Sequence, residues 1–296
     1  MTPMIPPFFW QLCVNAILLG GLYALIAMGL NLQYGLTRIL NVAYGDFMIL
    51  SGYVTFWLFV LYGVIPPISI VVNFLLMVVI GLILYRFAFR RLFEVHKTSE
   101  RLEGSSVLVA FGLSYIIQNI IVAIWGGQLR SYTYLSGTIE MFGSIIIPLD
   151  KLLIFVIALI TSLSCYSFLK YHIIGKAMRA TKSQPHGAAT LGIDIFKMHG
   201  FSFCWGLGMA GVAGTLASVI YLLNPSAGLP FTYAGFIMVV LGGLGNLLGS
   251  TIAAFIIASV QIFVGYFWSV GIAELVVFSV LLIVLIWKPT GLLGGR

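Results

Sequence analysis

The chain has 296 residues, of which 61% are hydrophobic and only 8% are charged, and its mean hydropathy is +1.11. A soluble domain carries about 25% charged residues, so this composition excludes an ordinary soluble protein and indicates one that faces a bilayer. The net charge of +7 does not indicate nucleic acid. The basic residues gather in two short segments between apolar stretches, where they normally set membrane topology.

The apolar stretches predict an all-α polytopic membrane protein, a single domain over residues 1–296. Backbone groups in lipid must be paired within each segment, so the crossings should be helices of about 20 residues. We expect eight or nine crossings. In chain order they fall at residues 9–31, 42–61, 67–88, 106–125, 152–169, 200–223, 233–266 and 270–287, with a longer polar connection at 126–150.

The interior of two stretches is irregular. The sequence NVAYGDFMILSGY brings polar residues and glycine into the second crossing, near 41–52, and GGLGNLLGS at 242–250 divides the stretch 233–266 into two helical pieces. Those pieces are either two crossings or one discontinuous segment. Asn41 and Asp46 can face a cavity, or they can lie near the cytoplasmic boundary and cap the second helix. Glu274, early in the last crossing, is expected at the membrane interface.

The basic residues predict the orientation. Residues 86–103 and 170–197 hold ten of the fifteen lysines and arginines: Arg86, Arg90, Arg91, Lys97, Arg101, Lys170, Lys176, Arg179, Lys182 and Lys197. Because basic loops stay in the cytoplasm, the N-terminus should lie outside. Lys288 and Arg296 then place the C-terminus inside, which requires an odd number of crossings and therefore two within 233–266.

The second basic segment contains GKAMRATKSQPHGAATLGI, residues 175–193. Ser183 is expected to cap a short helix, Pro185 to occupy its first turn and Gly192 to end it. A short helix with a small-residue surface and a basic rim suits docking on a soluble protein. An ordinary loop that only sets topology is the alternative.

Small residues recur every four positions in the sixth crossing, at Gly206, Ala210, Gly214 and Ser218. This spacing favours close helix packing.

The same stretch formally matches a dinucleotide-binding glycine motif, but no strand precedes it. The sequence shows no Walker A motif, no catalytic cluster and no metal-ligand spacing, so we expect neither an enzyme nor a metal site.

Four stretches in order carry a resemblance that spans nearly the whole chain: GLYALIAMGLNLQYGLTRILNVAYGDFMILSGY, GKAMRATKSQPHGAATLGID, VVLGGLGNLLGSTIAA and KPTGLLG. The chain resembles the permease subunits of branched-chain amino acid type ABC importers. The usual Asn-Phe-Ala-His-Gly-Glu of the first stretch is here Asn41-Val42-Ala43-Tyr44-Gly45-Asp46. The general Glu-Ala-Ala of the second is here His186-Gly187-Ala188.

The resemblance implies a permease that forms half of a translocation path in a prokaryotic inner membrane. Its implied partners are a second homologous permease, two cytoplasmic ATPase subunits and a soluble substrate-binding protein. ATP is used by the ATPases, and this chain binds no cofactor. Substrates of similar importers are leucine, isoleucine and valine, and also urea, short amides and aromatic acids.

Within that family, the loop that contacts the ATPase corresponds to part of a cytoplasmic segment at 170–199. The residues expected to couple to the ATPase are Lys176, Arg179, Lys182, His186, Ala188 and Gly192. The residues expected to line the path belong to the two irregular stretches, since irregular backbone at membrane depth must be buried or line a cavity: Asn41, Tyr44, Asp46, Gly242, Gly243, Gly245 and Asn246. An ion-coupled secondary transporter is the rival class, for which only Asp46 and Glu274 are available.

Overall fold

The computed structural model describes residues 7–95, 99–141, 145–288 and 290–294; Lys97 and Arg296, used above to predict orientation, lie outside them. In the described part, eight helices are long and apolar enough to cross a membrane, and a ninth apolar helix is shorter. The prediction of an all-α polytopic membrane protein is confirmed. The helices are α1 (Pro7–Thr37), α2 (Tyr44–Tyr62), α3 (Pro66–Leu84), α4 (Arg90–Val95), α5 (Ser99–Trp125), α6 (Leu149–Tyr171), α7 (Ile173–Ser183), α8 (Pro185–Thr190), α9 (Ile195–Ile220), α10 (Gly228–Gly242), α11 (Leu247–Phe267) and α12 (Val270–Trp287).

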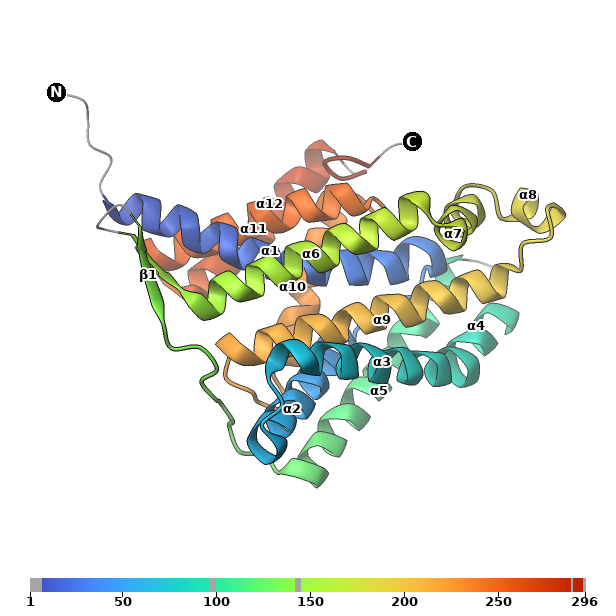
Figure 1. The fold of residues 1–296 in the computed structure, drawn as a ribbon. Coiled ribbons are helices and arrows are strands. Elements are labelled where there is room, and N and C mark those ends of the chain that lie inside the picture. The colour runs from blue at the N-terminus through green and yellow to red at the C-terminus, as the bar shows by residue number, and fades with distance from the viewer. Residues whose placement is uncertain (1–6, 96–98, 142–144, 289, 295–296) are drawn as a thin grey trace.

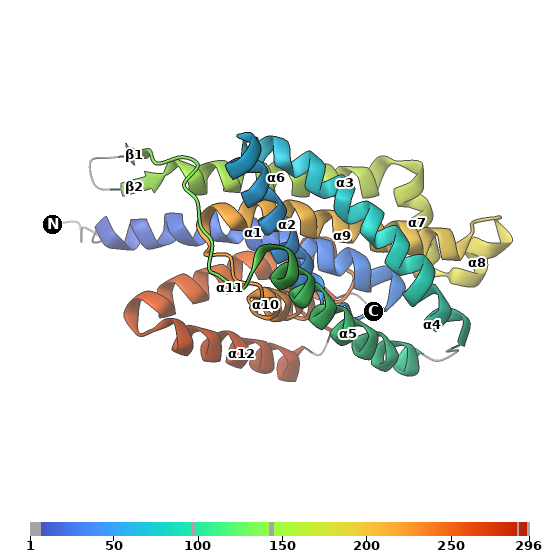
Figure 2. The ribbon, with the colours of Figure 1, turned by 90° about the horizontal axis from the view of Figure 1, so that it is seen from below.

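Helix α9 is the centre of the bundle. It packs along α1, α2 and α3, and α1 in turn packs along α11 and α6. Figure 1 shows α1, α6 and α9 running in nearly the same direction, whereas α10 crosses them steeply and is seen almost end-on in Figure 2. The outer helices α3, α5, α6 and α12 expose most of their apolar side chains, as expected of helices that face lipid or another subunit.

The irregular backbone expected in the second crossing lies before helix α2, at residues 38–43. Arg38 ends α1 in the left-handed conformation, with φ of 56°. Helix α2 then continues without a break from Tyr44. Of the stretch 41–52 that was expected to be irregular, only residues 41–43 lie outside the helix.

The stretch 233–266 consists of two helical pieces, α10 and α11, joined at residues 243–246. Helix α10 already begins at Gly228, earlier than the expected 233, and the break before it, expected after residue 223, lies at residues 221–227. The segment NPSAGLP carries the turn signals that mark this break. A long buried helix, a break and a second helix therefore occur in the same order at α1–α2 and at α9–α10.

The connection 126–150 contains two strands that were not predicted, β1 (Thr138–Met141) and β2 (Ile145–Pro148), which form an antiparallel hairpin with Ile139 opposite Ile147. The side-chain amide of Gln11 donates to the carbonyl of Ile146 at 2.8 Å, which attaches the hairpin to the start of α1. We call this the hairpin end of the molecule. Helices α7 and α8 lie at the opposite end (Figure 1), the α7–α8 end.

Candidate functional site

The first turns of α2 and α10 meet in the interior of the bundle. The backbone N–H of Gly45 donates to the hydroxyl of Thr232 at 2.8 Å, and that hydroxyl donates to the carbonyl of Val42 at 3.0 Å. A Cβ added at Gly45 would overlap the backbone of Gly228. The two helix N-termini are therefore in direct contact, and glycine at both positions permits the approach.

Asp46 lies at this contact and is fully buried. Its carboxylate accepts a hydrogen bond from the side-chain amide of Gln118 on α5 at 3.0 Å. Gly228 of α10 faces the same carboxylate. Asp46 thus joins α2, α5 and α10, and its carboxyl group lies beside the N-terminal ends of two helices, a position that stabilises the ionised form of a carboxyl group.

The alternative that Asn41 or Asp46 caps the second helix is wrong. The N-cap of α2 is Ala43, and no side chain caps it. Asn41 instead donates to the side-chain oxygen of Gln33 at 3.2 Å. Within the described part of the chain, the buried Asn41 Oδ1, Tyr44 hydroxyl and Asp46 Oδ2 have no hydrogen-bond partner. Such groups are rare in folded proteins, and here three occur in one short stretch.

The α10–α11 joint, residues 243–246, lies one helix length from Asp46, at the α7–α8 end. Gly243 and Gly245 have φ of +105° and +78°, which side chains rarely adopt. Asn31 holds the joint from α1, since its side-chain oxygen accepts from the N–H of Gly245 at 2.6 Å and its amide donates to the carbonyl of Asn246 at 2.9 Å. Gly242 packs against Gly249 across the joint.

The path residues expected from the sequence therefore do not gather at one place. Asp46 lies at the start of α10, whereas Asn41 and the Tyr44 hydroxyl contact α1 at Gln33 and Gly29, and Gly242, Gly243, Gly245 and Asn246 gather at the end of α10. Helix α10 has 15 residues, so Asp46 and the joint are roughly 22 Å apart along it. Gly245 and Asn246 line a pocket of about 490 Å³ at the α7–α8 end, together with Arg179 and Lys182.

Lys182 of α7 contacts the joint directly. Its ammonium donates to the carbonyl of Gly245 at 2.7 Å. Burial of the ammonium, and then the nearby Arg38 guanidinium, lower the pKa of Lys182. This hydrogen bond connects the basic segment to the α10–α11 joint.

The other coupling residues expected from the sequence divide between the surface and the interior. His186, Lys176 and Arg179 are exposed, and Arg179 donates to the carbonyl of Lys170 at 3.0 Å. Ala188 is only 3% exposed, so its methyl group faces the bundle. Directly after α8, the apolar side chain of Leu191 is 80% exposed, and no role was expected for it from the sequence.

The cap assigned to Ser183 is wrong, because Ser183 ends α7 and Gln184 is the N-cap of α8. Pro185 takes the first helical position of α8, where its missing N–H has no consequence. Gly192 follows α8 with φ of +80°, the conformation in which helices commonly end.

The four small residues of α9 are all buried. Gly206 faces the backbone of Gly29 on α1, and Gly214 faces the backbone of Met48 on α2. Next to Gly214, α9 also takes part in a buried polar cluster that was not expected from the sequence. The Asn73 amide donates to the hydroxyls of Thr55 and Thr215, each at 2.7 Å, and this joins α3, α2 and α9.

A cavity of about 530 Å³ lies between α1, α10, α11 and α12, and we call it the α10–α12 cavity. Its walls are mostly apolar, and its polar lining includes Tyr23, Gln261 and Glu274. The Tyr23 hydroxyl donates to the side-chain oxygen of Gln261 at 2.6 Å. Glu274 is exposed, in the second turn of α12. Of these three residues only Glu274 is marked by the sequence, because Tyr23 and Gln261 are far apart in the chain and only folding brings them together.

Long apolar helices around buried polar breaks, with a basic helical segment at one end, define the class of this protein as a multi-pass membrane protein. The family model described as "Branched-chain amino acid transport system / permease component" matches residues 12–286. The chain belongs to this family, and it is a transport subunit rather than a catalytic enzyme.

Curated relatives agree with this assignment. The chain is 29% identical to the high-affinity branched-chain amino acid transport system permease protein LivH of Salmonella typhimurium, over 97% of this chain and 96% of the relative. It is 26% identical to the corresponding permease protein BraD of Pseudomonas aeruginosa, with the same coverage. Identity to the probable branched-chain amino acid transport permease protein LivH of Methanocaldococcus jannaschii is 28%, over 86% of this chain and 80% of the relative. No solved structure matches the chain.

Proposed function

We propose that this permease forms half of the membrane path of an ATP-driven importer for a small hydrophobic amino acid, with leucine, isoleucine and valine as the principal substrates. The observation that carries the proposal is the α10–α12 cavity. Ligand sites are mostly apolar, with a few polar groups that fix orientation. Apolar walls suit an aliphatic side chain, and the polar groups of Tyr23, Gln261 and Glu274 suit a zwitterion.

The chemistry of the cavity also ranks the substrates. The Glu274 carboxylate can accept from an α-ammonium, and the Gln261 amide can donate to an α-carboxylate. Urea has no apolar surface with which to fill a cavity of about 530 Å³. Aliphatic amino acids are therefore favoured over urea and short amides, and the printed names of LivH and BraD point to the same substrate class for those relatives.

Helix α10 supplies a route between the two ends of the permease. Pro230, Ala234 and Ile237 of α10 line the cavity, while its last residue adjoins the joint that Lys182 contacts. A displacement of α7 is thereby passed to the joint and along α10 to the cavity wall. Helix α11 follows the same joint and lines the same cavity with Ile257 and Gln261.

We further propose that α8 docks on a cytoplasmic ATPase subunit. His186, Ala189 and Leu191 are exposed there, and an exposed apolar side chain on a short helix with a basic surround suits a groove on a soluble partner. Two such ATPases, a second homologous permease and a soluble substrate-binding protein complete the importer. ATP acts at the ATPases, so this chain holds no cofactor of its own.

The proposed membrane is the prokaryotic inner membrane, with the hairpin end outside and the α7–α8 end in the cytoplasm. Under this orientation α10 is a short ninth crossing, the N-terminus is outside and the C-terminus inside. Leu292 and Leu293 support the inside position of the C-terminal segment, because their backbone N–H groups donate to the carbonyls of Leu241 and Gly242 at the joint.

Uptake by proteoliposomes that contain the complete importer tests the proposal. ATP is supplied on the side of the membrane that carries the ATPases. We expect leucine, isoleucine and valine to accumulate on that same side, even when proton and sodium gradients are collapsed. A secondary transporter would lose uptake under that treatment. Preferential uptake of urea, a short amide or an aromatic acid would contradict the substrate assignment and leave the permease assignment intact.

A further inference from the structure

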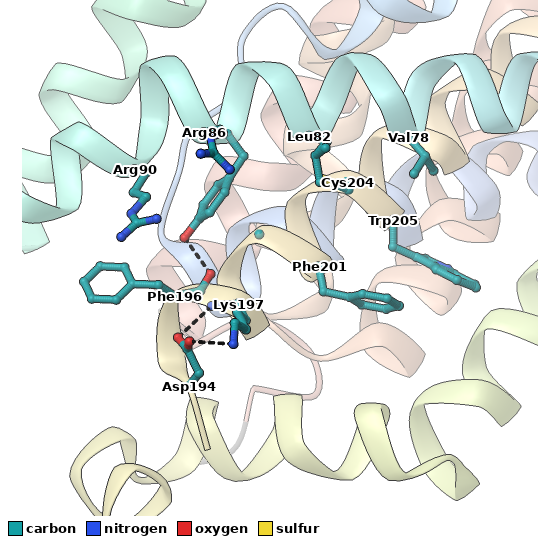
Figure 3. Close-up of a pocket in the computed structure, with 12 residues that line it drawn as sticks. Val78, Leu82, Arg86, Arg90, Asp194, Phe196, Lys197, Phe201, Cys204 and Trp205 are labelled. Carbon is teal, nitrogen blue, oxygen red and sulfur yellow. Dashed lines mark hydrogen bonds and ion pairs between the residues drawn. The ribbon is translucent and has the colours of Figure 1, made fainter. Parts of the chain in front are cut away.

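A groove separates α3 and the π-helical turn that continues it (Tyr85–Phe89) from the start of α9. Its volume is about 500 Å³. Figure 3 shows that its two ends differ in character. Arg86, Arg90 and Lys197 gather at one end, and Val78 and Trp205 lie at the other.

The apolar end is lined by packed aromatic rings. Trp205 is held between two aromatic rings, stacked on Phe168 with ring centroids 4.7 Å apart and edge-on to Phe74 at 5.4 Å. Gly200 leaves room for the ring of Tyr85, which a Cβ would contact at 2.8 Å. On the opposite wall, Leu82 is 62% exposed and points toward the groove (Figure 3). This lining is suited to a hydrocarbon chain.

The charged end carries one cation more than its neighbours neutralise. Lys197 pairs with Asp194 at 3.4 Å, and Arg90 pairs with Glu94 at 3.2 Å. Among the residues that the structure describes, Arg86 has no hydrogen-bond or ion-pair partner. A guanidinium beside apolar surface binds phosphate oxygens in a bidentate manner.

The position of the groove relates these two ends to a bilayer. Asp194 belongs to the connection between α8 and α9, so the charged end lies at the α7–α8 end, which is cytoplasmic under the proposed function. The apolar end follows α3 and α9 toward the membrane interior. The cytoplasmic leaflet is rich in anionic lipids, and basic pockets between transmembrane helices on that side bind their headgroups.

We propose that this groove binds an anionic phospholipid, with the phosphate at Arg86 and an acyl chain between Leu82 and Trp205. The site is separate from the α10–α12 cavity, because it lies on α3 and α9 and shares no lining residue with that cavity. The lipid would stabilise the packing of the start of α9 against α3. Helix α9 follows α8, the helix proposed to dock on the ATPase.

The test measures lipid retention by the purified full-length permease with native mass spectrometry, using phosphatidylglycerol and phosphatidylcholine of identical chains. We expect phosphatidylglycerol to be retained preferentially. Arg86→Gln should weaken that retention about fivefold, as expected for one interfacial cation. Arg101→Gln is the matched control, because Arg101 is exposed near the same end and does not line the groove, and it should retain lipid as the unmodified chain does.

A second variant tests the apolar end. Leu82→Trp adds a large ring at the membrane-exposed wall and should lower retention of phosphatidylglycerol while the protein stays folded by circular dichroism.

Equal retention of the two lipids, or unchanged retention in Arg86→Gln, would overturn the proposal. Displacement of phosphatidylglycerol by millimolar inorganic phosphate would also overturn it, because the site would then recognise a free anion. Occupation of the groove by an ATPase subunit would appear as cross-links from Arg86→Cys to that subunit, and this result too would exclude the lipid.

Discussion

Replacing Lys182 by methionine should uncouple the two ends of the permease. The substitution removes the hydrogen bond from the Lys182 ammonium to the Gly245 carbonyl, 2.7 Å long, and retains a side chain of similar length. A hydrogen bond that involves a charged group contributes about 1.5–3 kcal/mol. Because Lys182 is exposed over much of its surface, solvent screening reduces this contribution to about 1 kcal/mol.

A coupling free energy of about 1 kcal/mol corresponds to roughly a fivefold change in an equilibrium constant. Lys182→Met should therefore lower the number of substrate molecules transported per ATP about fivefold, with basal ATPase activity unchanged and the unfolding temperature lowered by about 2–4 °C at most. The assay is simultaneous measurement of uptake and phosphate release in proteoliposomes.

The matched control for this experiment is Lys170→Met. Lys170 is a lysine at the same end of the molecule, but its ammonium lies over the rings of Tyr166 and Tyr171, not against the joint. It should leave the ratio of transport to hydrolysis unchanged. An unchanged ratio in Lys182→Met would refute the reasoning, and an equal loss in both variants would show that charge at this end matters and the contact with the joint does not.

Three further substitutions have distinct expected outcomes. Asp46→Asn keeps an oxygen for the Gln118 amide, so it should fold normally yet lower uptake through loss of charge, and normal uptake would contradict a role in the path. Gly228→Ala places a methyl group against the Asp46 carboxylate and should destabilise the fold by about 1–3 kcal/mol in thermal unfolding. Its control, Gly271→Ala, meets open space and should not lower the unfolding temperature. Leu191→Asp should abolish copurification with the ATPase while the bundle stays folded, and retained copurification would exclude α8 as the docking element.

The long apolar helices were predictable because a bilayer leaves few alternatives for such a sequence. The two pieces of 233–266 followed from glycines that could not belong to an ordinary crossing. The break between the sixth crossing and the stretch 233–266 was predictable, because Asn224 and Pro225 signal a turn. The start of α10 at Gly228 was not predicted, because Gly228 and Pro230 also belong to those turn signals. The strands at 138–141 and 145–148 were missed because they have four residues each, too few for a clear alternation.

The candidate site was only partly predictable. The sequence marked Asp46 as unusual, but both interpretations of it concerned α2 alone, whereas its contacts come from Gln118 on α5 and Gly228 on α10. Ala188 was expected on the docking surface because it is small, yet its small size fits it to the interior of the bundle. Which face of a six-residue helix is buried depends on packing against α7 and α9, and six residues are too short for a periodic pattern to reveal it.

We propose above that the α10–α12 cavity belongs to the translocation path and that its accessibility changes when the α7–α8 end moves. Ala234 lines the cavity and is partly exposed, so an Ala234→Cys variant reports on access once Cys13, Cys165 and Cys204 are replaced. The measurement is the rate at which a membrane-impermeant thiol reagent, added from the outside, labels this cysteine in the reconstituted importer with and without ATP trapping. We expect the rate to change on trapping and the change to be lost in Lys182→Met. An identical labelling rate in the two states would contradict the account.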